Sequence, residues 1–242
     1  MSTIRITIGN DSKEIDIYSD EGFRLVAELW TKTSFHHRLM YEPLWLGIPI
    51  IQYPNDIIVM QELIWKIKPD VIIETGVAHG GSTIMYASIL ELLGKGRVIA
   101  IDIEIRSHNK AAIENHPLSK RIDLVEGSSV DQKIVKTVKA MIKRGEKVLV
   151  ILDSDHSADH VRRELIYYSP LVTTDSYMVV MDGVQEKLWD VPSGKEEWRH
   201  DNPLVAIKEF LQQNQMQWQV DYYYNRLCVT AYHGGFLKRL NT

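Results

Sequence analysis

The sequence predicts a doubly wound α/β fold, a Rossmann-like parallel sheet that ends in an antiparallel C-terminal strand pair. From Pro69 onward, five short apolar runs alternate with segments of helical periodicity. The first run, at 71–74, leads into a turn with three glycines and then into a helix. Two strand-like runs, at 218–223 and 228–232, follow the last expected helix and form the pair.

The residues before this alternation of strands and helices are expected to form a small hairpin and helix extension. Isoleucines alternate with polar residues on either side of Gly9-Asn10-Asp11, which predicts a β-hairpin. Apolar residues at 21–40 have helical spacing. An aromatic, proline-broken stretch then leads to a helix at about 57–66, which the polar residues before it can cap. We therefore expect an extension at 1–45 and the main domain at 46–242.

The main domain is expected to consist of five strand–helix units. The expected strands are 71–74, 97–102, 122–126, 147–152 and 177–181. The expected helices are 82–93, which ends at Gly94, then 109–115, 132–144, 159–168 and 203–212. A long polar and aromatic loop at 183–202 could shape a specificity pocket or a lid.

Composition excludes several functional classes. A length of 242 residues, 45% hydrophobic and 25% charged, suits one α/β domain with an added element. The net charge of −4 gives no support for a nucleic-acid partner. The single cysteine, Cys228, excludes an intramolecular disulfide and is expected in the core. No apolar run approaches ~18 residues and the first 30 residues lack a signal pattern, so we expect no membrane insertion and a cytoplasmic protein.

The glycine turn indicates which ligand the sheet edge could bind. The glycines stand as Gly76-x-x-x-Gly80-Gly81 rather than in the GxGxxG order of a dinucleotide site. Glu74, just before the turn, would repel a pyrophosphate but could accept hydrogen bonds from an ammonium group. The pattern E-x-G-x-x-x-G is typical of S-adenosylmethionine (SAM) sites, and Asp102 ends the next strand, where an acid can hold ribose hydroxyls. The alternative is a tight turn whose glycines serve packing.

Acidic residues end four of the five expected strands. They are Glu74, Asp102, Asp153 and Asp182. Because ligands bind at the carboxyl ends of parallel strands, this convergence predicts a cationic ligand or a divalent metal.

The segment Asp153-Ser154-Asp155-His156, after a fully apolar strand, is the strongest metal signal. His156 could act as general base, since its reference pKa near 6.5 suits a proton acceptor. Asp155 is equally well explained as a helix cap, and His160 as a plain helix residue. A histidine–carboxylate zinc site lacks the usual spacing, and the absence of a G-x-S-x-G elbow argues against acyl transfer.

The chain resembles the cephalosporin hydroxylase / rhamnosyl O-methyltransferase family of SAM-dependent enzymes, which shares its fold with catechol O-methyltransferases. The matching segments cover nearly all of the chain from about residue 40. They include ETGVAHGGS at 74–82, RIDLVEGSS at 121–129, LDSDHSADHVRRELIYYSPLV at 152–172 and SYMVVMDG at 176–183. The main domain is thus expected to be a SAM-dependent methyltransferase domain.

The resemblance implies cofactor contacts residue by residue. The methionine and ribose part of SAM would lie against Glu74, Gly76, His79, Gly80, Gly81 and Ser82. Asp102 would hold the ribose hydroxyls, and the adenine would contact Ile103, Gly127, Ser128 and Ser129.

The resemblance also implies the catalytic centre. Asp153 and Asp182 would bind Mg²⁺, with Asp155 as a further ligand, and Asp153 would also contact the cofactor. His156 stands where catechol-type enzymes carry their catalytic lysine, so His156 and Asp153 are the expected catalytic residues. Met181 departs from relatives that have an acid at this position, and its side chain supplies no oxygen.

These observations predict a SAM-dependent, Mg²⁺-dependent O-methyltransferase. The expected acceptor is a hydroxyl of a sugar or glycosylated small molecule, in surface polysaccharide or natural-product biosynthesis, and the resemblance favours a homo-oligomer. One alternative is a non-catalytic SAM-binding accessory subunit of a two-protein modification system, which Met181 would suit. A nicotinamide-dependent oxidoreductase is disfavoured by the glycine spacing and by Glu74.

Overall fold

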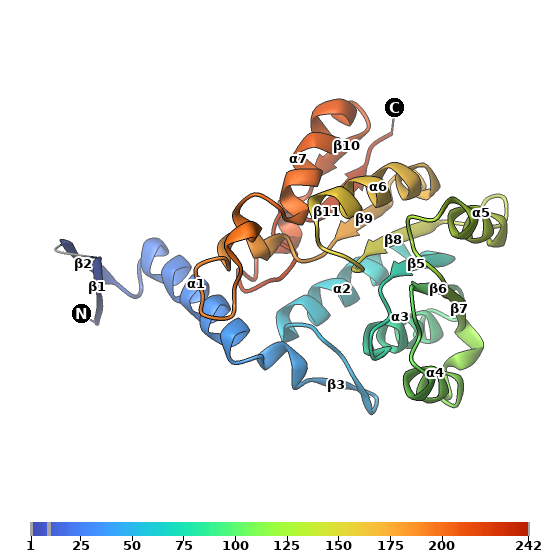
Figure 1. Ribbon diagram of the computed structural model, residues 1–242, viewed down its shortest axis with the longest axis horizontal. Helices are drawn as coiled ribbons and strands as arrows, with labels where there is room; N and C mark the ends of the chain where they lie inside the picture. The colour runs from blue at the N-terminus through green and yellow to red at the C-terminus, as the bar shows by residue number, and fades with distance from the viewer. Residues whose placement is uncertain (1, 9–10, 242) are drawn as a thin grey trace.

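A seven-stranded sheet forms the centre of the computed structural model, which describes residues 2–8 and 11–241 (Figure 1). The strand order is β10-β11-β9-β8-β5-β6-β7. Five strands are parallel: β5 (Val71–Thr75), β6 (Arg97–Asp102), β7 (Ile122–Glu126), β8 (Val148–Leu152) and β9 (Tyr177–Val180). β11 (Phe236–Arg239) is antiparallel to both β9 and β10 (Trp218–Val220). The predicted doubly wound sheet with antiparallel C-terminal strands is confirmed.

The order of the strands reverses next to β5. The chain runs outward from β5 through β6 to β7, then returns to the other side of β5 as β8 and β9. Such a reversal leaves a crevice beyond the carboxyl ends of the central strands, where ligands of open α/β sheets bind. The residues that follow β5, β6, β8 and β9 are therefore brought to one edge.

Helices cover both faces of the sheet, which explains why its strands are apolar on both sides. One layer contains α2 (Pro54–Ile67), α3 (Gly81–Leu92) and α4 (Ser107–Glu114), which pack with alternate strand residues such as Ile72. The other contains α5 (Gln132–Met141), α6 (Ala158–Tyr168) and α7 (Pro203–Asn214), which pack with the residues between them, such as Ile73.

The N-terminal extension projects from this body (Figure 1). β1 (Thr3–Ile8) and β2 (Asp11–Asp16) form the predicted hairpin, although the turn residues Gly9 and Asn10 lie outside the described residues. The helix α1 (Asp20–His36) follows. Its far end contacts the loop after β9: Lys32 Nζ lies 2.7 Å from Asp190 Oδ2, and the Phe35 ring packs edge-on against Trp198. The loop at 183–202 thus holds α1 in place.

Short elements connect the main ones. The two-residue strands β3 (Leu44–Trp45) and β4 (Ile48–Pro49) pair between α1 and α2. The single 3-10 turns are η1 (Leu39–Tyr41), η2 (Ser119–Arg121), η3 (Ser169–Leu171), η4 (Gly183–Lys187), η5 (Glu196–Arg199) and η6 (Tyr222–Asn225). Among the described residues, no helix has the length and apolarity needed to cross a membrane.

The sequence placed three features wrongly. α2 begins at Pro54 rather than near residue 57, because proline is pre-organised for the first helical position. The last strand is 236–239 and not 228–232, whose apolar residues lie in a loop. Cys228 is exposed, with φ of 65°, and is not a core residue.

Candidate functional site

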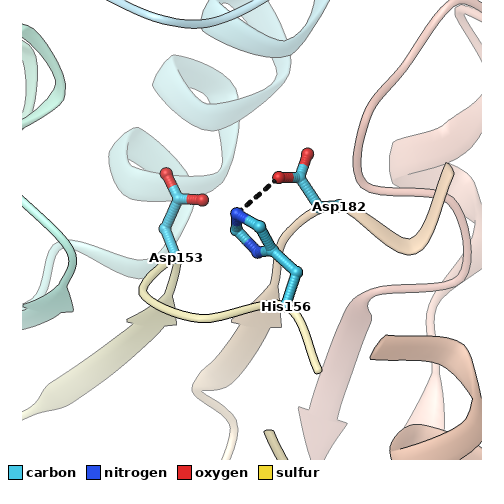
Figure 2. Close-up of side chains that lie close together, drawn as sticks. All are labelled: Asp153, His156 and Asp182. Atoms are coloured by element: carbon cyan, nitrogen blue, oxygen red, sulfur yellow. Dashed lines mark ion pairs between the residues drawn. The ribbon is translucent and has the colours of Figure 1, made fainter. Parts of the chain in front are cut away.

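Three side chains from two strand ends meet at the carboxyl edge of the sheet (Figure 2). Asp153 and His156 follow β8, and Asp182 follows β9. One ligand atom from each lies within 4.8 Å of the others, and His156 Nε2 is 2.9 Å from Asp182 Oδ2. His156 and Asp182 each keep 31% of their side-chain surface exposed, so a ligand can reach them. We call these three residues the acid–histidine cluster.

The cluster concentrates charge, and this shifts its protonation. Burial alone lowers the pKa of His156, but the charge and hydrogen bond of Asp182, with Asp153 and Asp155 nearby, raise it to about 9. Burial and the charge of Asp182 raise the pKa of Asp153 well above its ordinary range, against the effect of His156. The neighbouring acids thus favour the charged form of the imidazole, a shift that its reference pKa near 6.5 did not indicate.

The cluster opens into a cavity of about 260 Å³, the cluster cavity. One wall is the glycine turn, with Gly76, His79, Gly81 and Ser82. Another part of the wall comes from residues 35–53, the cover segment, which contributes Phe35, Met40, Tyr41, Pro49, Ile51, Gln52 and Tyr53. Residues 183–202 do not line this cavity in the described part of the chain, so the cover segment, rather than that loop, shapes the site.

The glycines of the turn are explained by close packing. Gly76 has φ of +89°, and a β-carbon there would lie 2.0 Å from the Asp153 carbonyl oxygen. A β-carbon on Gly81 would lie 2.2 Å from the Pro49 oxygen, and one on Gly80 would meet the Ile113 side chain. The packing interpretation of the glycine spacing thus holds for all three, and it does not compete with a ligand site at the same turn.

The backbone donors of this turn are mostly used inside the protein. Val77 N and Ala78 N donate to Asp102 Oδ2 at 2.8 and 3.1 Å. Gly76 N donates to the Ile101 oxygen and Gly80 N to the Val77 oxygen. An anionic ligand group would therefore need donors from other residues.

Asp102 borders a second cavity of about 350 Å³, the Asp102 cavity. It is lined by Gly76, Ile101, Asp102, Ile103, Ser128, Ser129, Ser154, Asp155 and His160. Gly76 and Ser154 line both cavities, so the two adjoin at the end of β5. A ligand that spans them would present one end to Asp102 and the other to the acid–histidine cluster.

His160 is a candidate site residue that the sequence did not reveal. Its Nε2 lies 3.0 Å from both Ser129 Oγ and Ser154 Oγ, and Ser154 Oγ donates to the buried Glu164 Oε1 at 2.7 Å. The i,i+4 spacing of His160 and Glu164 on α6 was the available signal.

Several predicted contacts lie elsewhere. Glu74 is fully buried and accepts hydrogen bonds from the hydroxyls of Ser82 and Thr83, which leaves it outside both cavities. Gly80 and Gly127 pack against isoleucine side chains and line neither cavity.

Asp155 does not join the cluster, contrary to its expected role as a metal ligand. Its Oδ1 accepts from Ser157 N at 2.8 Å, and Ser157 is the residue that caps α6. The same oxygen accepts from the Ser157 hydroxyl. One oxygen of the Asp155 carboxylate therefore binds Ser157 at the start of the helix, and His156 is the third member of the cluster.

The donor set fits a divalent cation without help from Met181. Two carboxylates offer the oxygens that Mg²⁺ prefers, and the imidazole can serve as a ligand or as a neighbouring base. Met181 lines the cavity and is 2% exposed. Its thioether forms part of the apolar wall, which leaves Asp153 and Asp182 as the oxygen donors.

Comparison with known proteins points to one family. The family model for rhamnosyl O-methyltransferase/CmcI matches residues 37–240. A rhamnosyl O-methyltransferase of Mycobacterium tuberculosis (strain H37Rv) is 31% identical over 156 residues, which cover 64% of this chain and 58% of that protein. The match thus spans less than two thirds of this relative.

The fold recurs in solved structures. A CmcI structure with Mg and SAM has a TM-score of 0.60 at 19% identity, covering 83% of this chain and 78% of that one. An O-methyltransferase from Bacillus cereus in complex with SAH has a TM-score of 0.52 at 15% identity, covering 85% and 84%.

Proposed function

The chain belongs to the rhamnosyl O-methyltransferase/CmcI family, and we propose that it is a SAM-dependent, Mg²⁺-dependent O-methyltransferase that acts on a sugar hydroxyl. One observation carries this proposal. The acid–histidine cluster lies in a cavity that the glycine turn also lines, and that cavity adjoins a second one with an acid at its wall. Residues that could bind a metal, accept a proton and hold the two ends of a cofactor are thus next to one another.

The adjoining cavities suit the two ends of SAM. Asp102 could accept hydrogen bonds from ribose hydroxyls, and Ile103, Ser128 and Ser129 would supply apolar and polar contacts for adenine. The shared residues Gly76 and Ser154 mark the passage between the cavities. The sulfonium and its methyl group would then lie on the side of the acid–histidine cluster.

The residues of the cluster would divide the chemistry among them. Asp153 and Asp182 would hold Mg²⁺, which when bound lowers the pKa of a coordinated hydroxyl. Because the bound Mg²⁺ would balance the charge of these carboxylates, His156 would return to the neutral form. It would then accept the proton of the acceptor hydroxyl. The wall of the cavity would align the hydroxyl oxygen with the methyl carbon.

The cover segment supports a saccharide as the acceptor. Phe35 and Tyr41 contribute aromatic side chains to the cluster cavity, and aromatic faces suit the apolar face of a sugar ring. Two neighbouring hydroxyls could also share one ion. The curated relative is named for transfer to a rhamnosyl group.

We further propose that the protein works as a homo-oligomer in the cytoplasm, where SAM is available.

The proposal is tested by two measurements on the purified protein. Calorimetry should detect binding of S-adenosylhomocysteine (SAH) and none of NAD⁺. Methyl transfer from SAM to a panel of rhamnosides and other vicinal diols should occur with Mg²⁺ and stop with excess EDTA. SAH binding without transfer to any diol would favour the accessory-subunit alternative, and binding of NAD⁺ in place of SAH would overturn the proposed function.

A further inference from the structure

Two buried polar atoms that lack a partner belong to residues of the cluster cavity. Among the described residues, four buried side-chain atoms have no hydrogen-bond partner: Gln52 Oε1, Glu164 Oε2, Ser176 Oγ and Tyr232 OH. Gln52 and Tyr232 line the cluster cavity, whereas Ser176 lines neither this cavity nor the Asp102 cavity. Buried polar groups are nearly always satisfied, so an unpartnered pair at one cavity calls for an explanation.

Both side chains are fixed in place by the surrounding structure. Gln52 is 4% exposed, and its Nε2 lies 3.4 Å from the hydroxyl of Tyr86 on α3. Tyr232 is 1% exposed, its ring packs on Phe236, and its backbone N donates to Thr230 Oγ1 at 2.9 Å. The two residues are 180 positions apart in the sequence, and both line the cluster cavity.

The chemistry of the two atoms is complementary to an amino-acid zwitterion. A tyrosine hydroxyl donates to a carboxylate, and an amide oxygen accepts from an ammonium. In the free protein neither atom forms a hydrogen bond, which costs free energy. A ligand with a carboxylate and an ammonium would form both hydrogen bonds and recover that free energy.

The position of the pair selects one end of the cofactor. The Asp102 cavity carries the acid suited to ribose, so the other end of SAM falls in the cluster cavity. The turn offers few donors there, because Val77 N and Ala78 N already bind Asp102. Glu74, the acid first expected to meet the ammonium, is taken by two hydroxyls of α3.

We propose that Gln52 and Tyr232 bind the amino-acid end of SAM, an inference that rests on the proposed function. Tyr232 OH donates to the cofactor carboxylate, and Gln52 Oε1 accepts from its ammonium. Both are positioning residues: they hold the amino-acid end and so fix the direction in which the sulfonium presents its methyl group.

The test compares two ligands that differ only at this end of the molecule. SAH carries the amino acid, and 5′-methylthioadenosine lacks it. Tyr232→Phe removes the hydroxyl, and Gln52→Met removes the amide group, including the Nε2 that contacts Tyr86, while both keep the approximate shape of the side chain. We expect each variant to weaken SAH binding about tenfold by calorimetry and to leave methylthioadenosine binding unchanged. The thermal midpoint of the free Tyr232→Phe protein should stay the same or rise, because the lost hydroxyl had no partner.

Ser176→Ala is the matched control, since it removes an unpartnered buried hydroxyl outside both cavities and should not change SAH affinity. Wild-type SAH affinity in both variants would overturn the inference. So would a lower thermal midpoint for Tyr232→Phe, which would show that the fold itself uses the hydroxyl. If the wild-type protein binds neither ligand, the proposed function fails as well, whereas the preceding outcomes leave it standing.

Discussion

Gly76 lies so close to the backbone of Asp153 that a β-carbon on Gly76 would fall 2.0 Å from the Asp153 carbonyl oxygen. Asp153 N also donates to the Thr75 oxygen at 2.9 Å, which ties the end of β5 to the loop after β8. The glycine turn and the acid–histidine cluster are therefore parts of one packed unit. A substitution in the turn should therefore displace residues of the cluster.

Gly76→Ala should destabilise the fold more than its backbone angle alone requires. An alanine at left-handed φ costs about 1–2 kcal/mol, and the contact with Asp153 adds to this cost. Gly145→Ala is the control, because Gly145 also has φ of +89° but nothing within 4 Å of its would-be β-carbon. Urea unfolding should show a clearly larger loss for Gly76→Ala. Equal losses in the two variants would mean that the contact is relieved at no cost.

Asp182→Ala should separate catalysis from cofactor binding. The substitution removes an oxygen donor of the cluster and the partner of His156, while the glycine turn and the Asp102 cavity are left intact. We expect methyl transfer to fall at least ~100-fold and SAH affinity to stay within about threefold of wild type. Asp190→Ala, which removes an acid that pairs with Lys32 outside the cavity, should retain activity. An Asp182→Ala protein with wild-type turnover would rule out the metal site proposed here.

The stability of the protein should depend on pH through Asp56. This carboxyl is fully buried on α2, and burial raises its pKa to about 7, although Thr230 and Ala231 donate hydrogen bonds to it. Above the unfolded value of 3.8 the unfolded chain gives up this proton while the folded chain retains it. The folded state therefore loses relative stability as pH rises from about 4 to about 7.

Asp56→Asn removes this titration and can keep the acceptor oxygen for Ala231 N. Between pH 5 and pH 8 the wild-type free energy of unfolding should fall by on the order of 3 kcal/mol more than that of Asp56→Asn. Urea unfolding of both proteins at the two pH values measures the difference, in which all other groups cancel. Parallel pH profiles would show that Asp56 ionises as freely in the folded protein as in the unfolded chain.

The sequence correctly predicted those strands that are marked by a short apolar or alternating run. The bounds expected for β6 and β7 agree with the structure, because each is an apolar or alternating run between polar residues. The strand predicted at 228–232 is absent because apolar residues indicate burial but do not indicate pairing with a neighbouring strand. Ala231 and Tyr232 are buried in a loop that Asp56 holds through Thr230 and Ala231, across a separation of about 175 residues. No local pattern encodes such a contact.

The candidate site followed the same rule. Strand ends predicted that Asp153 and Asp182 would converge, because the topology of a parallel sheet determines this. The choice between Asp155 and His156 depended on one turn of backbone at the start of α6, where Ser157 donates to Asp155. The pair Gln52 and Tyr232 had no signal at all, since an unpartnered atom is recognised only when its surroundings are known.

His160→Ala should identify the adenosine end of the cofactor site. His160 Nε2 lies 3.0 Å from Ser129 Oγ and lines the Asp102 cavity, away from the cluster cavity. Loss of the imidazole frees Ser129 and opens the adenine side, so we expect SAH and methylthioadenosine to bind about tenfold more weakly and to an equal extent. His108→Ala, an exposed substitution on α4, is the control and should leave both affinities unchanged. An effect on SAH alone would place His160 at the amino-acid end, because only that ligand carries it. Two results together would establish the direction in which the cofactor lies across Gly76. His160→Ala would weaken the binding of both ligands equally, and Tyr232→Phe would weaken the binding of SAH alone.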